Sequence, residues 1–292
     1  MMMHKDPVIQ RFIRWGQEHK AVRAMLLTRS RVKPSASVDA WSDYDVVLVV
    51  EEIQPFFVDR GWLQDFGRVV VAYWDPIHPV PDFADLEQVG NVVLFQDGLK
   101  IDFILWPVEL LPRLARSAVL PADLDLGYAV LVDKDRLTAG IRAPTYSAYI
   151  PTPPTNETYQ KVIEDFFSDV PYVVKCLRRD ELMPAKYCLD FDMKHNFLRQ
   201  MLDWRMECDR DWSVPTGFLG RGLKTSLPPE IWSQLERTYV GAGIEENWDA
   251  LFRTLALFRQ VSVEVAERLG YAYPYDMDRL VVAYAQEVRG VA

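Results

Sequence analysis

Apolar residues recur at every second position along the first half of the chain and at helical spacing along the second half. Side chains alternate across a strand and repeat every 3.6 residues around a helix, so the first pattern predicts strands and the second predicts helices. Asp6-Pro7 marks the start of a first helix, because aspartate caps helices and proline fits their first position. The pattern also predicts strands at residues 22–28, 69–74 and 128–132, helices at 54–66 and 108–116, and a loop or partial helix at 75–90.

The clearest boundary in the chain is residues 151–155, which read PTPPT. So many prolines cannot continue a helix or a central strand. Beyond them the helical period holds to the end of the chain, and Pro171 is expected either to kink its helix or to begin a new one. We therefore expect an α+β protein, with a mixed β-sheet and flanking helices in domain 1–150 and an all-α helical bundle in domain 151–292.

A β-hairpin is predicted by the run NVVLFQDGLKIDFILW, because Asp97-Gly98 lies between two β-rich segments. Asp102 then falls on the second strand of the hairpin, with Ile101 and Phe103 on the opposite face. A carboxylate between apolar neighbours is costly to bury without a partner. Asp102 therefore either faces solvent or belongs to a charged site.

A further strand, ending near residue 50, opens with Ser42-Asp43-Tyr44-Asp45. Asp43 and Asp45 share one face of it, and two carboxylates on one face repel each other unless a cation lies between them. Mg²⁺ is the expected cation because it prefers oxygen ligands. The alternative for so short a pattern is a polar loop that enters a strand. Asp102, as a third carboxylate, favours the metal site.

Several motifs carry a resemblance to known proteins: Ser30-Arg31 followed by SDYD at 42–45, Lys100-Ile101-Asp102, GYAVLVDKD at 127–135, YVVK at 172–175 and FLRQMLDW at 197–204. Together they resemble the aminoglycoside 6-adenylyltransferases, the streptomycin-modifying group of the DNA polymerase β-like nucleotidyltransferase superfamily. The resemblance runs from about residue 6 to about residue 274. It implies a nucleotidyltransferase-like sheet in the first domain and a substrate-binding role for the helical one.

The resemblance also implies an activity: transfer of AMP from ATP to a hydroxyl of a streptomycin-like aminoglycoside, with release of pyrophosphate. Two Mg²⁺ ions would be held by Asp43, Asp45 and Asp102, with Asp102 on the catalytic ion. The nucleotide contacts implied are Ser30, Arg31, Ser42 and Lys175, with Lys175 reaching the triphosphate from the helical domain. Asp190 would accept the hydroxyl proton, with Asp192 as the second choice, and residues 82–87 are candidates to line the acceptor site.

Ordinary alternatives stay open for these residues. Arg31 is equally explained as a solvated loop charge or as the partner of an aspartate. Lys175 fits a solvated helix face, and Asp190 fits an exposed helix aspartate. His195 does not complete a metal-ligand set by spacing and is expected to be structural.

Arg29 departs from the family pattern, which usually has Gly-Ser-Arg where this chain has Arg29-Ser30-Arg31. Glycine at this position lets the backbone approach a phosphate closely. The departure motivates a second hypothesis, a nucleotide-binding or sensing protein that kept the fold and lost turnover. A third hypothesis keeps the transfer chemistry but changes the acceptor to another small metabolite or a protein.

Composition further limits the classes of function and the cellular compartment that the sequence supports. A formal net charge of -9 argues against sequence-independent nucleic-acid binding and suits a cationic substrate. Cys176, Cys188 and Cys208 have no CxxC spacing, so buried free thiols are expected. With no signal-peptide pattern and no long apolar run, the expectation is a cytoplasmic protein away from membranes, either a monomer or a weak homodimer. Walker, Rossmann, G-x-S-x-G and H-E-x-x-H motifs do not occur.

Overall fold

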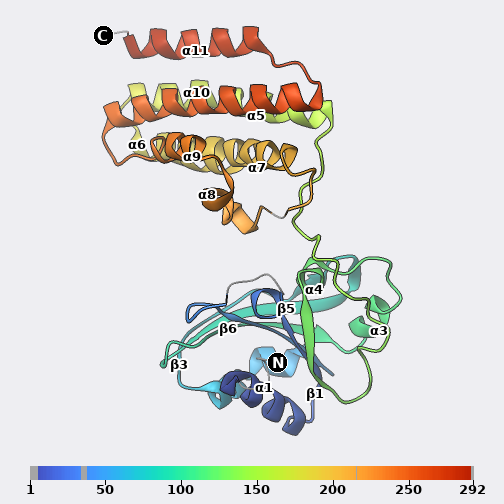
Figure 1. Ribbon diagram of the computed structural model, residues 1–292. Coiled ribbons are helices and arrows are strands. Elements are labelled where there is room, and N and C mark those ends of the chain that lie inside the picture. Colours follow the sequence, from blue (N-terminus) through green and yellow to red (C-terminus); the bar gives the residue numbers. More distant parts are fainter. Residues whose placement is uncertain (1–5, 34–37, 215, 291–292) are drawn as a thin grey trace. The chain divides into compact units, whose positions relative to one another are not determined.

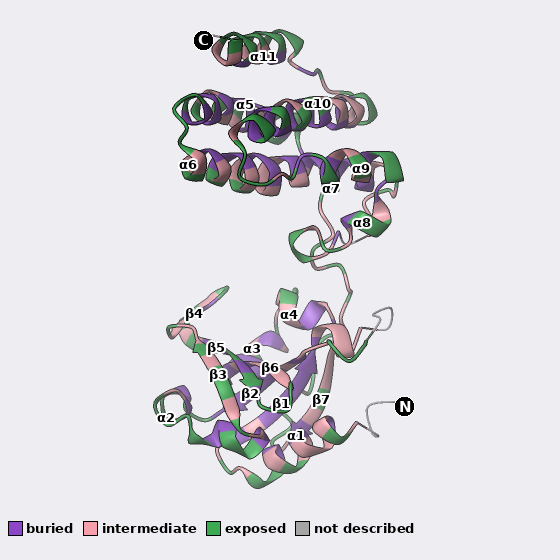
Figure 2. Cartoon of the chain, turned by 90° about the vertical axis from the view of Figure 1, so that its left-hand side faces the viewer, coloured by how far each residue is buried: buried purple, intermediate pink, exposed green. Residues whose placement is uncertain are grey.

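The computed structural model describes residues 6–33, 38–214 and 216–290. The chain forms two compact units, Met1–Ala148 and Tyr149–Ala292 (Figure 1). Buried residues line the sheet of the first unit and the inner faces of the long helices of the second, so each unit has a hydrophobic core of its own (Figure 2).

The first unit is built on a seven-stranded mixed sheet in the order β3-β5-β6-β2-β1-β7, with the short β4 paired to β5. Strands β2 and β6 run parallel, and the other pairs are antiparallel. The predicted hairpin around Asp97-Gly98 connects β5 to β6. The strands are β1 (Val22–Thr28), β2 (Tyr44–Val50), β3 (Val69–Trp74), β4 (His78–Val80), β5 (Phe83–Phe95), β6 (Lys100–Pro107) and β7 (Tyr128–Asp133).

Helical segments cover both faces of this sheet. On one face α1 (Pro7–Glu18), α2 (Ile53–Val58) and the 3₁₀ turn η3 (Gly61–Phe66) pack against an aromatic core. On the other face α3 (Leu110–Leu114) and α4 (Ala122–Asp125) cover a smaller apolar layer. Asp6 caps α1 as predicted, accepting hydrogen bonds from Val8 N at 2.9 Å and Ile9 N at 3.3 Å.

Three expected elements of the first unit were wrong in kind or extent. Residues 54–66 form two short helices rather than one, because Asp59 Oδ1 accepts from Gly61 N at 2.9 Å and turns the chain between them. Most of residues 75–90 belongs to β4 and β5 instead of a loop; proline is tolerated in β4 because this strand pairs with β5 alone. The helix expected at 108–116 is confined to Leu110–Leu114.

Helices are the only regular secondary structure among the described residues of the second unit, and loops connect them. Its elements are α5 (Asn156–Arg178), α6 (Leu182–Lys186), the π-helical η4 (Tyr187–Leu198), α7 (Arg199–Cys208), η5 (Phe218–Gly220), α8 (Leu223–Ser226), α9 (Pro229–Glu236), α10 (Ile244–Leu269) and α11 (Tyr275–Gly290). A mixed sheet with flanking helices followed by an all-helical unit confirms the predicted α+β class. No described helix is both long and apolar enough to cross a membrane.

Helix α5 runs unbroken through Pro171, so the alternative that a new helix begins there is wrong. Tertiary packing outweighs the hydrogen bond that proline removes. The ring of Phe166 in α5 stacks on that of Phe258 in α10, with centroids 3.6 Å apart. Of the three free cysteines, Cys176 and Cys188 are buried, and Cys208 is partly exposed.

Candidate active site

The parallel pairing of β2 and β6 places Asp45 directly opposite Asp102. Their sequence neighbours, such as Tyr44 and Ile101, point into the core beneath α1. Because side chains alternate along a strand, both carboxylates lie on the other face of the sheet. The side chain of Asp45 is 13% exposed and that of Asp102 is 26% exposed, so both are partly withdrawn from water.

Asp43 is linked to this pair by a lysine. The ammonium of Lys100 lies 2.6 Å from Oδ2 of Asp43 and 2.6 Å from Oδ1 of Asp102. Burial lowers the pKa of Lys100, but its hydrogen bonds to Asp102 and Asp43 outweigh this effect, and the pKa is raised overall. A charged ammonium therefore lies between two of the three candidate metal ligands.

The third candidate ligand, Asp45, also has a cationic partner. Arg29 donates from Nη1 to Oδ1 of Asp45 at 3.2 Å and from Nη2 to Oδ1 of Asp123 in α4 at 2.7 Å. Burial raises the pKa of Asp45 to about 6; Arg29 opposes the rise, and the nearby Asp102 and Asp43 add to it. Ionised Asp45 is thus stabilised only in part by the chain and favours a further cation.

The backbone of Arg29 adopts a left-handed conformation, with φ of 59°. This conformation costs a residue other than glycine about 1–2 kcal/mol. Its N–H donates to Gly127 O at 3.1 Å, which holds the 3₁₀ turn η2 (Arg29–Arg31) against the start of β7. Ser30, the predicted phosphate contact, lies half-buried in the middle of this turn, and its role stays a prediction.

Arg31 supports the loop that carries Asp43. Its Nε donates to Asp43 O at 3.0 Å and its Nη2 to Ser42 O at 2.7 Å. The guanidinium also lies 3.6 Å from the ring centroid of Tyr44 and 3.6 Å from Oδ2 of Asp6. These contacts match the alternative in which Arg31 is an aspartate partner, whereas nucleotide contact by Arg31 stays a prediction.

Ser42, another predicted nucleotide contact, closes a turn before β2. Its hydroxyl donates to Oδ1 of Asp39 at 2.9 Å and accepts from Asp39 N at 3.0 Å. In this conformation the Ser42 side chain orders the loop ahead of Asp43. Its contact with a nucleotide stays a prediction.

The chemistry of Asp43, Asp45 and Asp102 fits a hard divalent cation. All three offer carboxylate oxygens, the ligands that Mg²⁺ prefers. Lys100 and Arg29 lie against these oxygens, which shows that the cluster attracts positive charge. We conclude that the donor set suits Mg²⁺, while the number of ions stays a prediction.

A more compact group of candidate ligands lies in the second unit. Among the described residues, Asp169, Cys188 and Asp192 are the group whose ligand atoms all lie within 4.8 Å of one another. Burial raises the pKa of Cys188 to about 12 and also raises the pKa of Asp169, which the nearby Asp192 raises further. Because metal binding needs the deprotonated thiol, these shifts disfavour a metal here.

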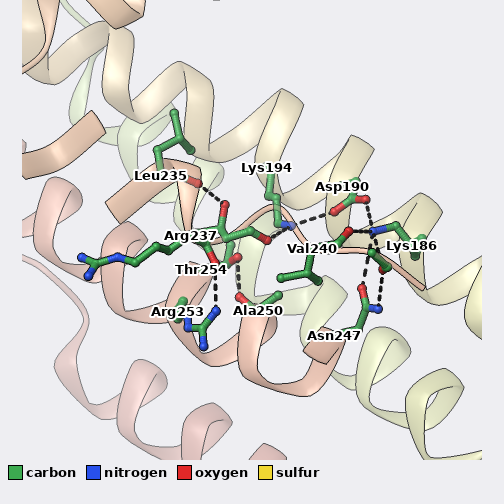
Figure 3. Close-up of polar contacts among 12 residues, drawn as sticks. Lys186, Asp190, Lys194, Leu235, Arg237, Val240, Asn247, Ala250, Arg253 and Thr254 are labelled. Carbon is green, nitrogen blue, oxygen red and sulfur yellow. Dashed lines mark hydrogen bonds and ion pairs between the residues drawn. The ribbon is translucent and has the colours of Figure 1, made fainter. Parts of the chain in front are cut away.

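Asp190, the candidate proton acceptor, lies in η4 between two lysines (Figure 3). Lys186 Nζ is 2.8 Å from Oδ2 of Asp190, and Lys194 Nζ is 2.7 Å from Oδ1. The side chain of Lys194 is fully buried and also donates to Thr238 O. Burial lowers the pKa of Lys194, and its hydrogen bond to Asp190 opposes that change. Each Asp190 oxygen keeps a lone pair for another donor.

The remaining candidates of the second unit differ in their surroundings. Lys175 is exposed on α5 and has no ion-pair partner in the described part of the chain. His195 stacks on Phe191, with centroids 5.8 Å apart, and lines a cavity of about 160 Å³ beside Lys194 and Trp232. The part played by Lys175 in nucleotide binding stays a prediction.

The acidic segment 82–87 of the first unit is largely the start of β5. Asp85 pairs with Arg113 at 2.7 Å, so this carboxylate already has a cationic partner. Contact with an acceptor stays a prediction for this segment.

Two partners of the cluster were not predicted from the sequence. Lys100 lies two residues before Asp102, a spacing that puts both side chains on one face of a strand, and this signal was present in the sequence. Asp123, which binds Arg29, lies in the short α4, and no sequence pattern pointed to it.

Comparison with known proteins identifies the class. The sequence model described as streptomycin adenylyltransferase matches residues 2–288. Three curated proteins named aminoglycoside 6-adenylyltransferase are similar to the chain. They are from Bacillus subtilis (28% identity, covering 98% of both chains), Campylobacter jejuni (28%, covering 94% of this chain and 93% of the relative) and Staphylococcus aureus (24%, covering 89% and 90%).

The protein is therefore a nucleotidyltransferase, as the resemblance of its motifs predicted. More narrowly, the chain belongs to the streptomycin adenylyltransferase family. A solved structure of an aminoglycoside 6-adenyltransferase from Bacillus subtilis covers 97% of the chain at 24% identity, with a TM-score of 0.45.

Proposed function

We propose that the protein transfers AMP from ATP to a hydroxyl of a streptomycin-like aminoglycoside and releases pyrophosphate. The observation that carries the proposal is the register pairing of Asp45 on β2 with Asp102 on β6, together with the Lys100 ammonium that contacts both Asp102 and Asp43. The curated relatives, which are named aminoglycoside 6-adenylyltransferases, support the acceptor class. The net charge of -9 favours a cationic acceptor over an anionic one.

The three carboxylates would hold the Mg²⁺ ions in this proposal, two by analogy with polymerases. Bound Mg²⁺ supplies positive charge to the triphosphate and to the leaving pyrophosphate. The chain itself holds the carboxylates in place through the β2–β6 register and through the Arg31 contacts to the loop before β2. Ser30, Ser42 and Lys175 are our candidates for contacts to the nucleotide.

The acceptor hydroxyl oxygen forms a bond to the α-phosphorus of ATP as the bond from that phosphorus to its bridging oxygen breaks. Pyrophosphate leaves with the electron pair of the broken bond. Asp190 is our candidate to accept the hydroxyl proton, because each of its oxygens keeps a lone pair beside the bond from lysine. Asp192 is the second candidate.

Mass spectrometry tests the proposal directly. We expect an AMP adduct of streptomycin when the protein is incubated with ATP, Mg²⁺ and streptomycin, and no adduct with Asp45→Asn. A panel of other aminoglycosides and hydroxylated metabolites in the same experiment tests for a different acceptor. A folded wild-type protein that forms no adduct with any acceptor contradicts the proposal.

A second candidate function, nucleotide binding without turnover, is favoured by the conformation and contacts of Arg29. Its guanidinium binds Asp45, one of the three carboxylates on which the metal depends. Calorimetry that detects binding of ATP with Mg²⁺, together with no adduct from the acceptor panel, supports this candidate. Adduct formation by the wild type excludes it.

A further inference from the structure

Lys100 is a charged residue of the cluster to which the proposed function gives no role. In the described part of the chain its ammonium donates to Asp43 and Asp102, each at 2.6 Å. Tyr44 pairs with Ile101 across β2 and β6, so continuing the register by one residue places Asp43 beside Lys100. The backbone of Lys100 therefore lies beside that of Asp43, one residue ahead of the neighbouring strand, and two residues before Asp102 on its own strand.

We propose that Lys100 is an exchangeable counter-ion, which holds Asp43 and Asp102 together in the metal-free protein and gives way to a divalent cation. Once displaced, its ammonium stays at the cluster and binds the triphosphate of ATP. This inference rests on the proposed function, because it takes the three carboxylates as the metal ligands.

The negative charges of Asp43 and Asp102 favour a cation between them. Asp43 and Asp102 both approach the same ammonium, and without it two carboxylates would face each other. The Lys100–Asp43 pair is weak enough to exchange, since the side chains of Lys100 and Asp43 are 34% and 39% exposed and solvent screens ion pairs at such sites. A divalent cation carries twice the charge and binds both oxygens directly, so it competes well.

The side chain of Lys100 also suits a second use after exchange. Its flexible stem moves the ammonium without moving the strand, and an ammonium is a common point-charge ligand for phosphate. Arg29 is less suited to exchange, because its guanidinium bridges Asp45 and Asp123 with two separate nitrogens. We therefore assign the exchange to Lys100 rather than to Arg29.

The test uses the metal alone. Mn²⁺ binding is followed by electron paramagnetic resonance in the wild type, in Lys100→Met and in Lys100→Arg. We expect Lys100→Met to bind Mn²⁺ about tenfold more tightly, because its competitor is gone, and Lys100→Arg to stay close to the wild type. Calorimetry with ATP and Mg²⁺ should show weaker nucleotide binding by Lys100→Met.

Thermal melting provides a second measurement, independent of activity. Without metal, Lys100→Met should melt about 3 °C below the wild type, and saturating Mg²⁺ should close most of that gap. Lys20→Met, which removes an exposed lysine outside the cluster, serves as the matched control and should leave metal affinity and melting unchanged. Lys100→Gln repeats the test if the methionine variant is poorly folded by circular dichroism.

The Asp45→Asn variant distinguishes failure of the counter-ion role of Lys100 from failure of the proposed function. If this variant abolishes the Mn²⁺ binding of the wild type, but Lys100→Met binds no more tightly than the wild type, the counter-ion role is overturned and the proposed function stands. If the wild type binds no Mn²⁺, or if Asp45→Asn binds Mn²⁺ as tightly as the wild type, the three carboxylates are not the metal site. Both proposals then fail.

Discussion

Asp45 on β2 and Asp102 on β6 are register partners in a parallel strand pair, although they are far apart in sequence. The β5–β6 hairpin places β6 beside β2, which brings the two carboxylates to one face of the sheet. The pairing is fixed by the apolar residues that alternate with them, since a slip of either strand by one residue would turn its aspartate into the core beneath α1. The core of the first unit thus sets the geometry of its candidate site.

Asp45→Asn should abolish AMP transfer without unfolding the protein. We expect activity to fall by about a thousandfold or more, equivalent to about 4 kcal/mol of transition-state stabilisation. Burial raises the pKa of Asp45 to about 6, so the ionised group is costly to keep at neutral pH, and a neutral asparagine should not lower the melting temperature of the metal-free protein. Pyrophosphate release and thermal melting measure the two effects.

The matched control for this variant is Asp135→Asn. Asp135 is an exposed partner of Arg23 in the same unit, away from the three carboxylates. Its removal should leave activity intact. A similar loss of activity in both variants would show that the effect is not specific to the cluster.

Arg29→Gly should separate backbone strain from charge. Glycine adopts the φ of 59° without penalty, whereas Arg29→Ala keeps the strain and loses the same ion pairs, so we expect the glycine variant to be about 1 kcal/mol more stable than the alanine variant. We also expect turnover above that of the wild type, because Asp45 loses a competing partner. Urea unfolding and adduct formation test these outcomes, and lower turnover in Arg29→Gly would assign Arg29 a productive role.

Asp203 should make the stability of the protein depend on pH. Burial in the second unit raises the pKa of Asp203 to about 6, and its ion pair with Arg199 opposes the rise. Its ordinary value is 3.8, so between these two values the folded state holds the proton more tightly than the unfolded state. The stabilisation of the folded state by protonated Asp203 is therefore complete below pH 4 and is lost as the pH rises through 6. The free energy of unfolding falls by about 3 kcal/mol in total over this range.

Asp203→Asn checks this sign. The slope of unfolding free energy against pH between 4 and 6 should be flatter in the variant than in the wild type, as measured by urea unfolding. Equal slopes in the two proteins would exclude Asp203 as the titrating group.

Asp190→Asn should destabilise the second unit as well as reduce transfer. The variant leaves buried Lys194 without its carboxylate, and breaking a buried pair in this way costs about 3 kcal/mol. Adding Lys194→Met should recover most of the stability without restoring activity. If the double variant regains activity, the role of Asp190 is to support Lys194 and not to accept a proton.

Much of the fold could be predicted from the sequence because the patterns that indicate its strands and turns are local. Residues 22–28 and 69–74 formed strands as predicted, and Asp97-Gly98 formed the hairpin turn. Residues 75–90 were missed because proline and aspartate usually interrupt strands, and only the sheet shows that β4, which contains Pro79, is an edge strand that tolerates proline. At Pro171 the alternative of a new helix failed for a different reason, since packing along α5 keeps the helix continuous.

The candidate site could be predicted in part from the same local sequence patterns. Period-two alternation predicted the strand face of Asp45 and Asp102, whereas Asp43 lies one residue ahead of β2 and not on the strand as expected. The alternation could not show which cations of the chain would contact these carboxylates. Arg29 reaches Asp45 through a left-handed backbone that sequence patterns do not encode for arginine. The π-helical form of η4, which carries Asp190 and Lys194, likewise has no sequence signature that we recognised.

The cap of the first helix has a consequence far from its own position. Asp6 accepts from Tyr44 Oη at 2.8 Å and faces Arg31, whose guanidinium grips the carbonyls of Ser42 and Asp43. One carboxylate near the start of the chain thus anchors both a helix and the loop that presents a candidate metal ligand. Loss of the Asp6 carboxylate would therefore weaken both the start of α1 and the loop that carries Asp43, although Asp6 lies outside the candidate metal cluster.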